Sequence, residues 1–130
     1  MNYEQARAYA VNVSRSGSIL GLDSIENLMH ELGDIQERLK IIHIAGTNGK
    51  GSTGAYLERV LIEAGYRVGR YSSPAVFDPM EVWRINLQSM SHEEYADIME
   101  QVKCACDRMV EKGMEHPTIF EVETAMAFLY

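Results

Sequence analysis

The 130-residue sequence contains little of what several specialised classes of protein require. It has only two cysteines, Cys104 and Cys106, which lie two positions apart in a segment with helical periodicity. Side chains two apart on a helix project in different directions, so we expect two small apolar residues in a reducing compartment rather than a metal site. No apolar run approaches the length of a membrane span, and the first ten residues lack the basic and apolar regions of a signal peptide. The sequence therefore predicts a cytoplasmic protein with no membrane partner.

The chain also lacks an excess of positive charge. Its 12 Lys and Arg residues face 19 Asp and Glu residues, which gives a formal net charge of −7. An acidic chain is a poor candidate for binding nucleic acid, although a local site can still hold an anionic small molecule. With 46% hydrophobic and 24% charged residues, the composition is that of one globular domain with its own core.

Apolar periodicity predicts an α/β chain. Helices are expected over Asn2–Val13, from Asp23 to just before Gly33, over Lys50–Ala64, from Ser91 to about Gly113, and from Thr118 onward. Capping-box spacing marks three of these starts, namely Asp23 with Glu26, Ser91 with Glu94, and Thr118 with Glu121. Two of the helices have a clear inward stripe, which we expect to be Leu57, Val60, Leu61 and Ala64 in one and Tyr95, Ile98, Met99, Val102, Met109 and Val110 in the other.

Short apolar runs predict the strands, which are expected over Lys40–Ala45, Tyr66–Ser73 and 82–87. The first of these is rich in isoleucine and is expected to be buried. A helix joins the first two, so these two strands are expected to be parallel, with a right-handed crossover. Two parallel strands alone make a poor sheet. The sheet of this chain is therefore expected to be incomplete.

A glycine-rich bend, GTNGKGST, lies between the first strand and its helix. Glycines let the backbone approach phosphate oxygens, and the N–H groups at a helix N-terminus favour an anion. Lys50 adds a full positive charge, and the hydroxyl of Ser52 or Thr53 can ligate a magnesium ion. The usual nucleotide-binding pattern has a glycine where Ile44 stands and Ser or Thr where Gly51 stands. A plain glycine-rich turn is the alternative, but the flanking strand and helix favour a P-loop-type mononucleotide-binding fold.

The same bend and several other stretches resemble one enzyme family. HIAGTNGKGST, together with AGYRVGRYSSP downstream, is similar to the folylpolyglutamate synthase/dihydrofolate synthase family, a branch of the Mur-ligase superfamily. The stretches GLDSIENLMHELG, SSPAVFDPMEVWRIN and PTIFEVETAMAFLY resemble further segments of that family. The resemblance covers nearly the whole chain, and it implies that the unusual loop spacing is the form that this family uses.

The resemblance implies an ATP-dependent ligase that activates a folate carboxylate as an acyl phosphate, which the amine of L-glutamate then attacks. Some members of the family join dihydropteroate to glutamate instead. The implied cofactors are ATP and Mg²⁺, with folate or dihydropteroate and L-glutamate as substrates. Lys50 is implied as the catalytic clamp on the phosphates. The residues implied to hold the nucleotide are Gly46, Thr47, Asn48, Gly49, Lys50, Gly51, Ser52 and Thr53.

Three residues are expected to ligate magnesium: Ser52 in the bend, and Ser73 and Glu121, which the resemblance implies. Local sequence leaves alternatives for two of them, because Ser73 can be a turn serine before Pro74 and Glu121 can be the capping-box partner of Thr118. The resemblance also implies a mobile loop over Ser73–Pro79 that covers folate and ATP. Val82 stands where the family has an arginine.

The family continues beyond the equivalent of Tyr130 with further ligands and a C-terminal domain that carries much of the glutamate site. We therefore expect residues 1–130 to be the N-terminal portion of the ATP-binding domain, inactive alone and prone to self-association through exposed apolar faces. Two alternatives stay open at this point. One is a stand-alone nucleotide-binding or regulatory module, and the other is a fragment of a Mur-type ligase for cell-wall precursors.

Overall fold

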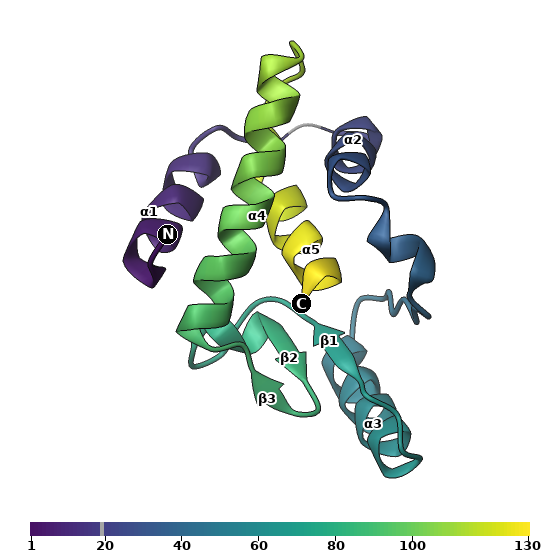
Figure 1. Cartoon of the computed structure of the whole chain (residues 1–130). Helices are drawn as coiled ribbons and strands as arrows, with labels where there is room; N and C mark the ends of the chain where they lie inside the picture. The colour runs from purple at the N-terminus through teal and green to yellow at the C-terminus, as the bar shows by residue number, and fades with distance from the viewer. Residues whose placement is uncertain (19) are drawn as a thin grey trace. The chain divides into compact units, whose positions relative to one another are not determined.

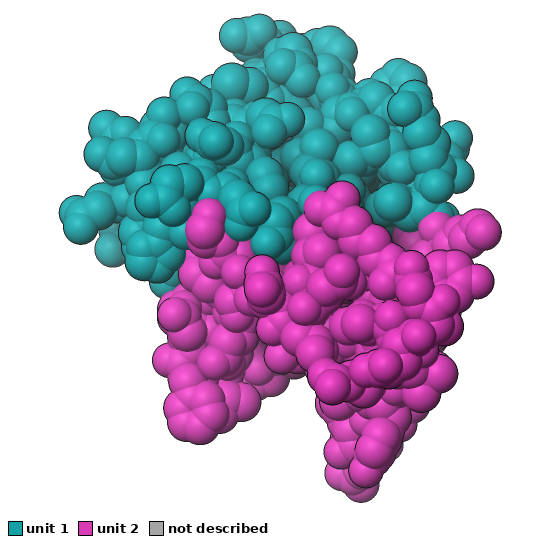
Figure 2. Space-filling view, turned by 60° about the horizontal axis from the view of Figure 1, so that its bottom comes forward, with its two compact units in different colours: residues 1–39, 92–130 teal, residues 40–91 magenta. Residues whose placement is uncertain are grey.

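The computed structural model describes residues 1–18 and 20–130, and these residues form two compact units (Figure 2). The helical unit comprises Met1–Leu39 and His92–Tyr130, and the sheet unit comprises Lys40–Ser91. None of the helices in the described ranges combines the length and the apolar character needed to cross a bilayer. The two units are described separately.

The helical unit is built around α4, which packs against α1, α2 and α5 (Figure 1). Its elements are α1 (Tyr3–Ser14), α2 (Asp23–Glu31), the 3₁₀ helix η1 (Ile35–Arg38), α4 (His92–Glu111) and α5 (Ile119–Leu129). The predicted stripe of α4 is confirmed for every member but one, because Tyr95, Ile98, Met99, Val102 and Met109 are all buried. Val110 is 49% exposed, since it lies about 100° around the helix from Met109.

Local capping explains where two of these helices begin. The Asn2 side chain accepts from the Gln5 N–H at 2.8 Å, and the Gln5 side chain accepts from the Asn2 N–H at 2.9 Å. Thr118 and Glu121 form the predicted capping box at the start of α5, where Glu121 Oε2 accepts from the Thr118 N–H at 2.8 Å. The prediction for Asp23 is wrong: this residue is already inside the first turn of α2, where its charge favours the positive end of the helix dipole.

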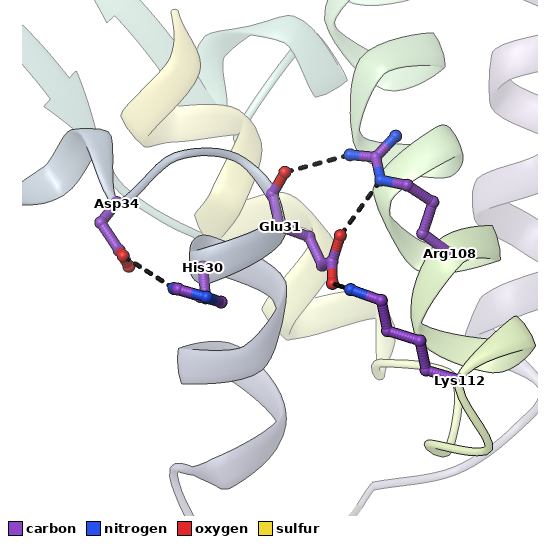
Figure 3. A network of polar contacts seen from close by, with 5 residues as sticks. All are labelled: His30, Glu31, Asp34, Arg108 and Lys112. Carbon is purple, nitrogen blue, oxygen red and sulfur yellow. Dashed lines mark hydrogen bonds and ion pairs between the residues drawn. The ribbon is translucent and has the colours of Figure 1, made fainter.

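A group of charged side chains ties α2 to α4 (Figure 3). Glu31 accepts from Arg108 Nε at 3.1 Å and from Lys112, and Arg108 also donates to the Glu31 carbonyl at 3.0 Å. Next to it, His30 Nδ1 lies 3.0 Å from Asp34 Oδ2. The hydrogen bonds from Lys112 and then Arg108 lower the pKa of Glu31 from its usual value of 4.5. The carboxylate form of Glu31 is therefore favoured by folding.

The sheet unit contains α3 (Lys50–Glu63), β1 (Gly69–Tyr71), the 3₁₀ helix η2 (Pro79–Val82), β2 (Trp83–Ile85) and β3 (Gln88–Ser89). The strands lie in the order β1-β2-β3 and both pairs are antiparallel, with Gly69 opposite Ile85 and Arg84 opposite Ser89. A two-residue turn joins β2 to β3. Its residues Asn86 and Leu87 both have positive φ, 47° and 71°, as tight hairpin turns of this kind require.

The predicted parallel pairing is wrong, although the α/β class is confirmed. Lys40–Ala45 forms no strand in the described ranges, and the side chains of Ile41 and Ile42 are 56% and 61% exposed. The segment Gly69–Tyr71 is a strand, but it pairs antiparallel with β2. A strand exists only with a hydrogen-bonding neighbour, and β2 returns beside β1 after residues 72–82, in an antiparallel arrangement that needs no crossover. An apolar run cannot specify which neighbour it will have.

The covered side of α3 also differs from the prediction. Val60 is 64% exposed and Ala64 is exposed, whereas Leu57 and Leu61 are partly covered. The buried residue of this helix is Glu58, which is only 3% exposed. The side that the sheet unit covers therefore runs along Glu58 and Leu61 rather than along Val60 and Ala64.

Candidate phosphate-binding site

The predicted loop lies in the sheet unit and leads directly into α3. Its eight residues are all exposed, namely Gly46, Thr47, Asn48, Gly49, Lys50, Gly51, Ser52 and Thr53. Gly46 and Gly49 have φ values of 155° and 78°, which side chains rarely allow. These two glycines are therefore needed for the path of the backbone, and the absence of side chains keeps the loop open.

The N-terminus of α3 differs from that of the other α-helices. Its N-cap residue is Gly49, and the residues that the structure describes provide no side-chain cap. Its first turn carries no acidic residue, whereas α1, α2, α4 and α5 each carry at least one. The first N–H groups of a helix and its dipole both favour a negative charge. In α3 no side chain supplies that charge, so the site is chemically suited to an external anion.

Lys50 is positioned over this loop. Its Nζ donates a hydrogen bond to the Gly46 carbonyl, so the ammonium folds back across the bend. Within the described part of the chain, no carboxylate forms an ion pair with it. A neutral carbonyl leaves the charge of Lys50 uncompensated and therefore available for an oxyanion.

The three residues expected to ligate magnesium do not all lie in one unit. Ser52 is in the first turn of α3, and Ser73 follows β1 in the same unit, exposed and joined to Pro74 by a cis peptide bond. Glu121 belongs to the helical unit, where it is 7% exposed and one of its oxygens is used in the capping box. The capping alternative raised by the sequence is thus present in the structure.

The donor set suits a hard cation better than a soft one. Hydroxyl and carboxylate oxygens are the ligands of Mg²⁺, which commonly keeps waters and binds substrate phosphates besides one or two protein groups. Among residues 1–18 and 20–130, no three His, Cys, Asp or Glu side chains gather as a metal site. Ser52 and Ser73 fit the Mg²⁺ pattern because they supply oxygen from the unit that contains the glycine-rich loop.

A charged cluster that the sequence pattern does not predict lies behind the loop and consists of the buried Glu58 and the partly buried Arg70 and Arg84. Arg70 Nη1 lies 3.3 Å from Glu58 Oε1, and Arg84 Nη2 lies 3.9 Å from the same oxygen. Arg70 Nη2 also donates to the carbonyl of Gly51 at 3.0 Å. One signal was visible in the sequence: Glu58 stands seven residues after Gly51, which places both on one side of the helix.

Relatives of known type match the chain along almost its whole length, although no family model matches it. It is 37% identical over 128 residues to the dihydrofolate synthase/folylpolyglutamate synthase of Bacillus subtilis, covering 98% of the chain and 30% of that protein. The crystal structure of folylpolyglutamate synthase from Thermotoga maritima matches with a TM-score of 0.88 and 36% identity, covering 98% of the chain and 30% of that structure.

A third match is a bifunctional folylpolyglutamate synthase/dihydrofolate synthase solved with Mn, AMPPNP and L-glutamate bound. Its TM-score is 0.82 at 32% identity, covering 99% of the chain and 30% of that structure. The chain thus spans about 30% of the length of these relatives. Over the residues that it spans, the chain belongs to the folylpolyglutamate synthase/dihydrofolate synthase family.

Proposed function

We propose that this chain is the nucleotide-binding portion of an ATP-dependent ligase that joins L-glutamate to a folate or to dihydropteroate. The observation that carries the proposal is the N-terminus of α3, which follows two positive-φ glycines and has neither a side-chain cap among the described residues nor an acidic first turn. The relative with Mn, AMPPNP and L-glutamate supports ATP, a divalent metal and glutamate as ligands. The names of the three relatives favour a folate over a cell-wall precursor.

Formation of an acyl phosphate requires a loop that both positions the phosphates of ATP and counters their charge. A carboxylate is a poor electrophile, and ATP supplies the phosphoryl group that gives it a leaving group. The protein must hold the phosphates in place and counter their negative charge. The backbone N–H groups at the start of α3 and the ammonium of Lys50 provide both, because they are fixed next to one another by Gly49 and Gly46.

The residues proposed to hold Mg²⁺ are Ser52, Ser73 and Glu121. Ser52 follows Lys50 by two positions, so its hydroxyl belongs to the same helical turn as the phosphate clamp. Ser73 lies just past β1, whose pairing with β2 is extended by a hydrogen bond of 3.0 Å from the Ser72 N–H to the Val82 carbonyl. Glu121 has one carboxylate oxygen engaged by its helix cap, and the other is the candidate ligand.

We also propose that residues 1–130 form the N-terminal portion of the ATP-binding domain, with the glutamate-binding domain outside them. The coverage of about 30% of each relative supports this division. On this proposal the 130-residue chain binds nucleotide but forms no amide bond.

Both cysteines are free thiols, which suits the reducing cytoplasm as the proposed compartment.

The test is calorimetry of AMPPNP binding to the chain in the presence of Mg²⁺. Lys50→Ala should weaken binding about tenfold or more, since a charge-assisted hydrogen bond is lost. Lys40→Ala is the matched control, because Lys40 is an exposed lysine of the same unit outside the loop. The proposal is wrong if the unaltered chain binds no nucleotide, or if Lys50→Ala binds it as well as Lys40→Ala does.

A further inference from the structure

One guanidinium contacts α3 at two points on the same side of the helix. Arg70, on β1, donates from Nη2 to the carbonyl of Gly51 at 3.0 Å and from Nη1 to Glu58 Oε1 at 3.3 Å. Gly51 and Glu58 are two helical turns apart. Carbonyls point toward the C-terminal end of a helix, whereas side chains tilt toward its N-terminal end. The two acceptors therefore converge between these turns, where the planar fork of arginine can reach both.

Gly54 lies at this point of convergence. A β-carbon at position 54 would come within 3.4 Å of Arg70 Nε and of Arg70 Nη2. The guanidinium therefore rests against the bare backbone of α3, with room for a methyl group at most. The φ angle of Gly54 is not in the positive range that requires glycine, so close packing against Arg70 is the reason for a small residue here.

The ion pair between Arg70 and Glu58 is largely shielded from solvent. The side chains of Arg70 and Glu58 are 16% and 2% exposed, and a carboxylate buried to this extent needs a cationic partner. Arg84 is the more distant partner at 3.9 Å, and its Nε and Glu58 Oε2 have no hydrogen-bond partner within the described part of the chain. Arg70 is therefore the residue that links Glu58 to the start of α3.

We propose that Arg70 is a positioning residue for the phosphate loop. By holding the Gly51 carbonyl, it fixes the first turn of α3, and with it the N–H groups and the adjacent Lys50 that face the anion. Arg70 does not itself contact the nucleotide. The proposal rests on the proposed function for the identity of the ligand, but the positioning of the turn is measurable without any ligand.

Two variants separate positioning from simple charge pairing. Arg70→Lys keeps a cation for Glu58, but an ammonium cannot reproduce the two-pronged contact. Arg70→Ala removes both contacts. We expect AMPPNP affinity to fall about tenfold in both variants, because each loses the hydrogen bond to Gly51. The thermal midpoint should fall clearly in Arg70→Ala and much less in Arg70→Lys.

Hydrogen exchange of the amides of residues 50–55, measured without nucleotide, is the second readout. It should become faster in Arg70→Lys, while exchange in the second half of α3 stays close to that of the unaltered chain. The matched control is Arg59→Lys, since Arg59 pairs with Glu63 on the same helix at 3.4 Å but its side chain is 63% exposed. The control should change neither affinity nor exchange at residues 50–55.

The proposal is overturned if Arg70→Lys shows unchanged exchange at residues 50–55, because Arg70 is then only a charge partner for Glu58. Unchanged AMPPNP affinity in a chain that binds nucleotide overturns it as well. If the unaltered chain binds no nucleotide, the proposed function fails, but faster local exchange in Arg70→Lys still supports positioning. If Arg70→Ala does not fold, the comparison of Arg70→Lys with Arg59→Lys decides.

Discussion

The contact between Gly54 and Arg70 allows a sharp prediction, because two substitutions with similar helix propensity should have opposite effects. Gly54→Ala removes the cost of a glycine inside a helix, which is about 1 kcal/mol. Its β-carbon would lie 3.4 Å from Arg70, at ordinary contact distance, so the guanidinium can stay in place. We therefore expect Gly54→Ala to be more stable than the unaltered chain by up to about 1 kcal/mol.

Gly54→Leu has nearly the same helix propensity but a much larger side chain. The added atoms occupy the place of the Arg70 guanidinium and break its hydrogen bond to Gly51, which is worth about 1.5–3 kcal/mol because the donor is charged. After the gain in propensity, Gly54→Leu should be less stable than Gly54→Ala by about 2 kcal/mol or more. It should also bind AMPPNP more weakly, whereas Gly54→Ala should not.

Urea unfolding followed by circular dichroism measures the difference in stability between the two variants, and calorimetry measures the difference in AMPPNP affinity. The comparison between the two variants cancels the effect of glycine on the unfolded chain, since neither contains it at position 54. Equal stability and equal nucleotide affinity of Gly54→Ala and Gly54→Leu would contradict this expectation. Such a result would mean that Arg70 contributes nothing through its contact with the first turn of α3.

Three further predictions concern other parts of the chain. Hydrogen bonds from Lys112 and Arg108 lower the pKa of Glu31 in the folded state, so the Glu31 carboxylate contributes its full stability above the usual pKa of 4.5 and loses it as the pH falls below that value. Glu31→Gln should therefore reduce the acid sensitivity of urea unfolding, and an identical pH profile would contradict this. Burial raises the pKa of the Cys106 thiol to about 11, whereas Cys104 is exposed. A thiol reagent at neutral pH should therefore modify Cys104 first and Cys106 only on unfolding, and rapid modification of Cys106 in Cys104→Ser would contradict this. The side chains of Ile41, Ile42 and Val60 are exposed, so we predict that the chain self-associates. Sedimentation should show a mass that rises with concentration and rises less in Ile42→Asp, and a concentration-independent monomer would count against the prediction.

Much of the helical unit was predictable because its signals are local. The start of α5 follows from Thr118 and Glu121, which satisfy each other within one turn. The buried side of α4 follows from a spacing of three and four residues, which the helix itself imposes. The bend before α3 was predictable for the same reason, since Gly46 and Gly49 set the path of the backbone from which α3 begins at Lys50.

The sheet unit was less predictable because its contacts join residues that are distant in sequence. The segment Lys40–Ala45 has the composition of a buried strand, yet in the described ranges it has no strand as a neighbour. Glu58 lies outside the apolar stripe predicted for α3, yet it is buried beside two arginines that follow it by 12 and 26 positions (70 − 58 and 84 − 58). Neither fact is contained in the local pattern of charge and hydrophobicity.

The positions of the main helices and of the glycine-rich bend follow from the amino-acid sequence alone, since they depend on φ preferences, caps and periodicity within a few residues. The pairing of the strands, and the contact of Arg70 with both Gly51 and Glu58 across Gly54, become visible only in the folded structure. The reason is physical: a buried charge is tolerated only beside its partner, and that partner is brought there by strand pairing rather than by sequence proximity.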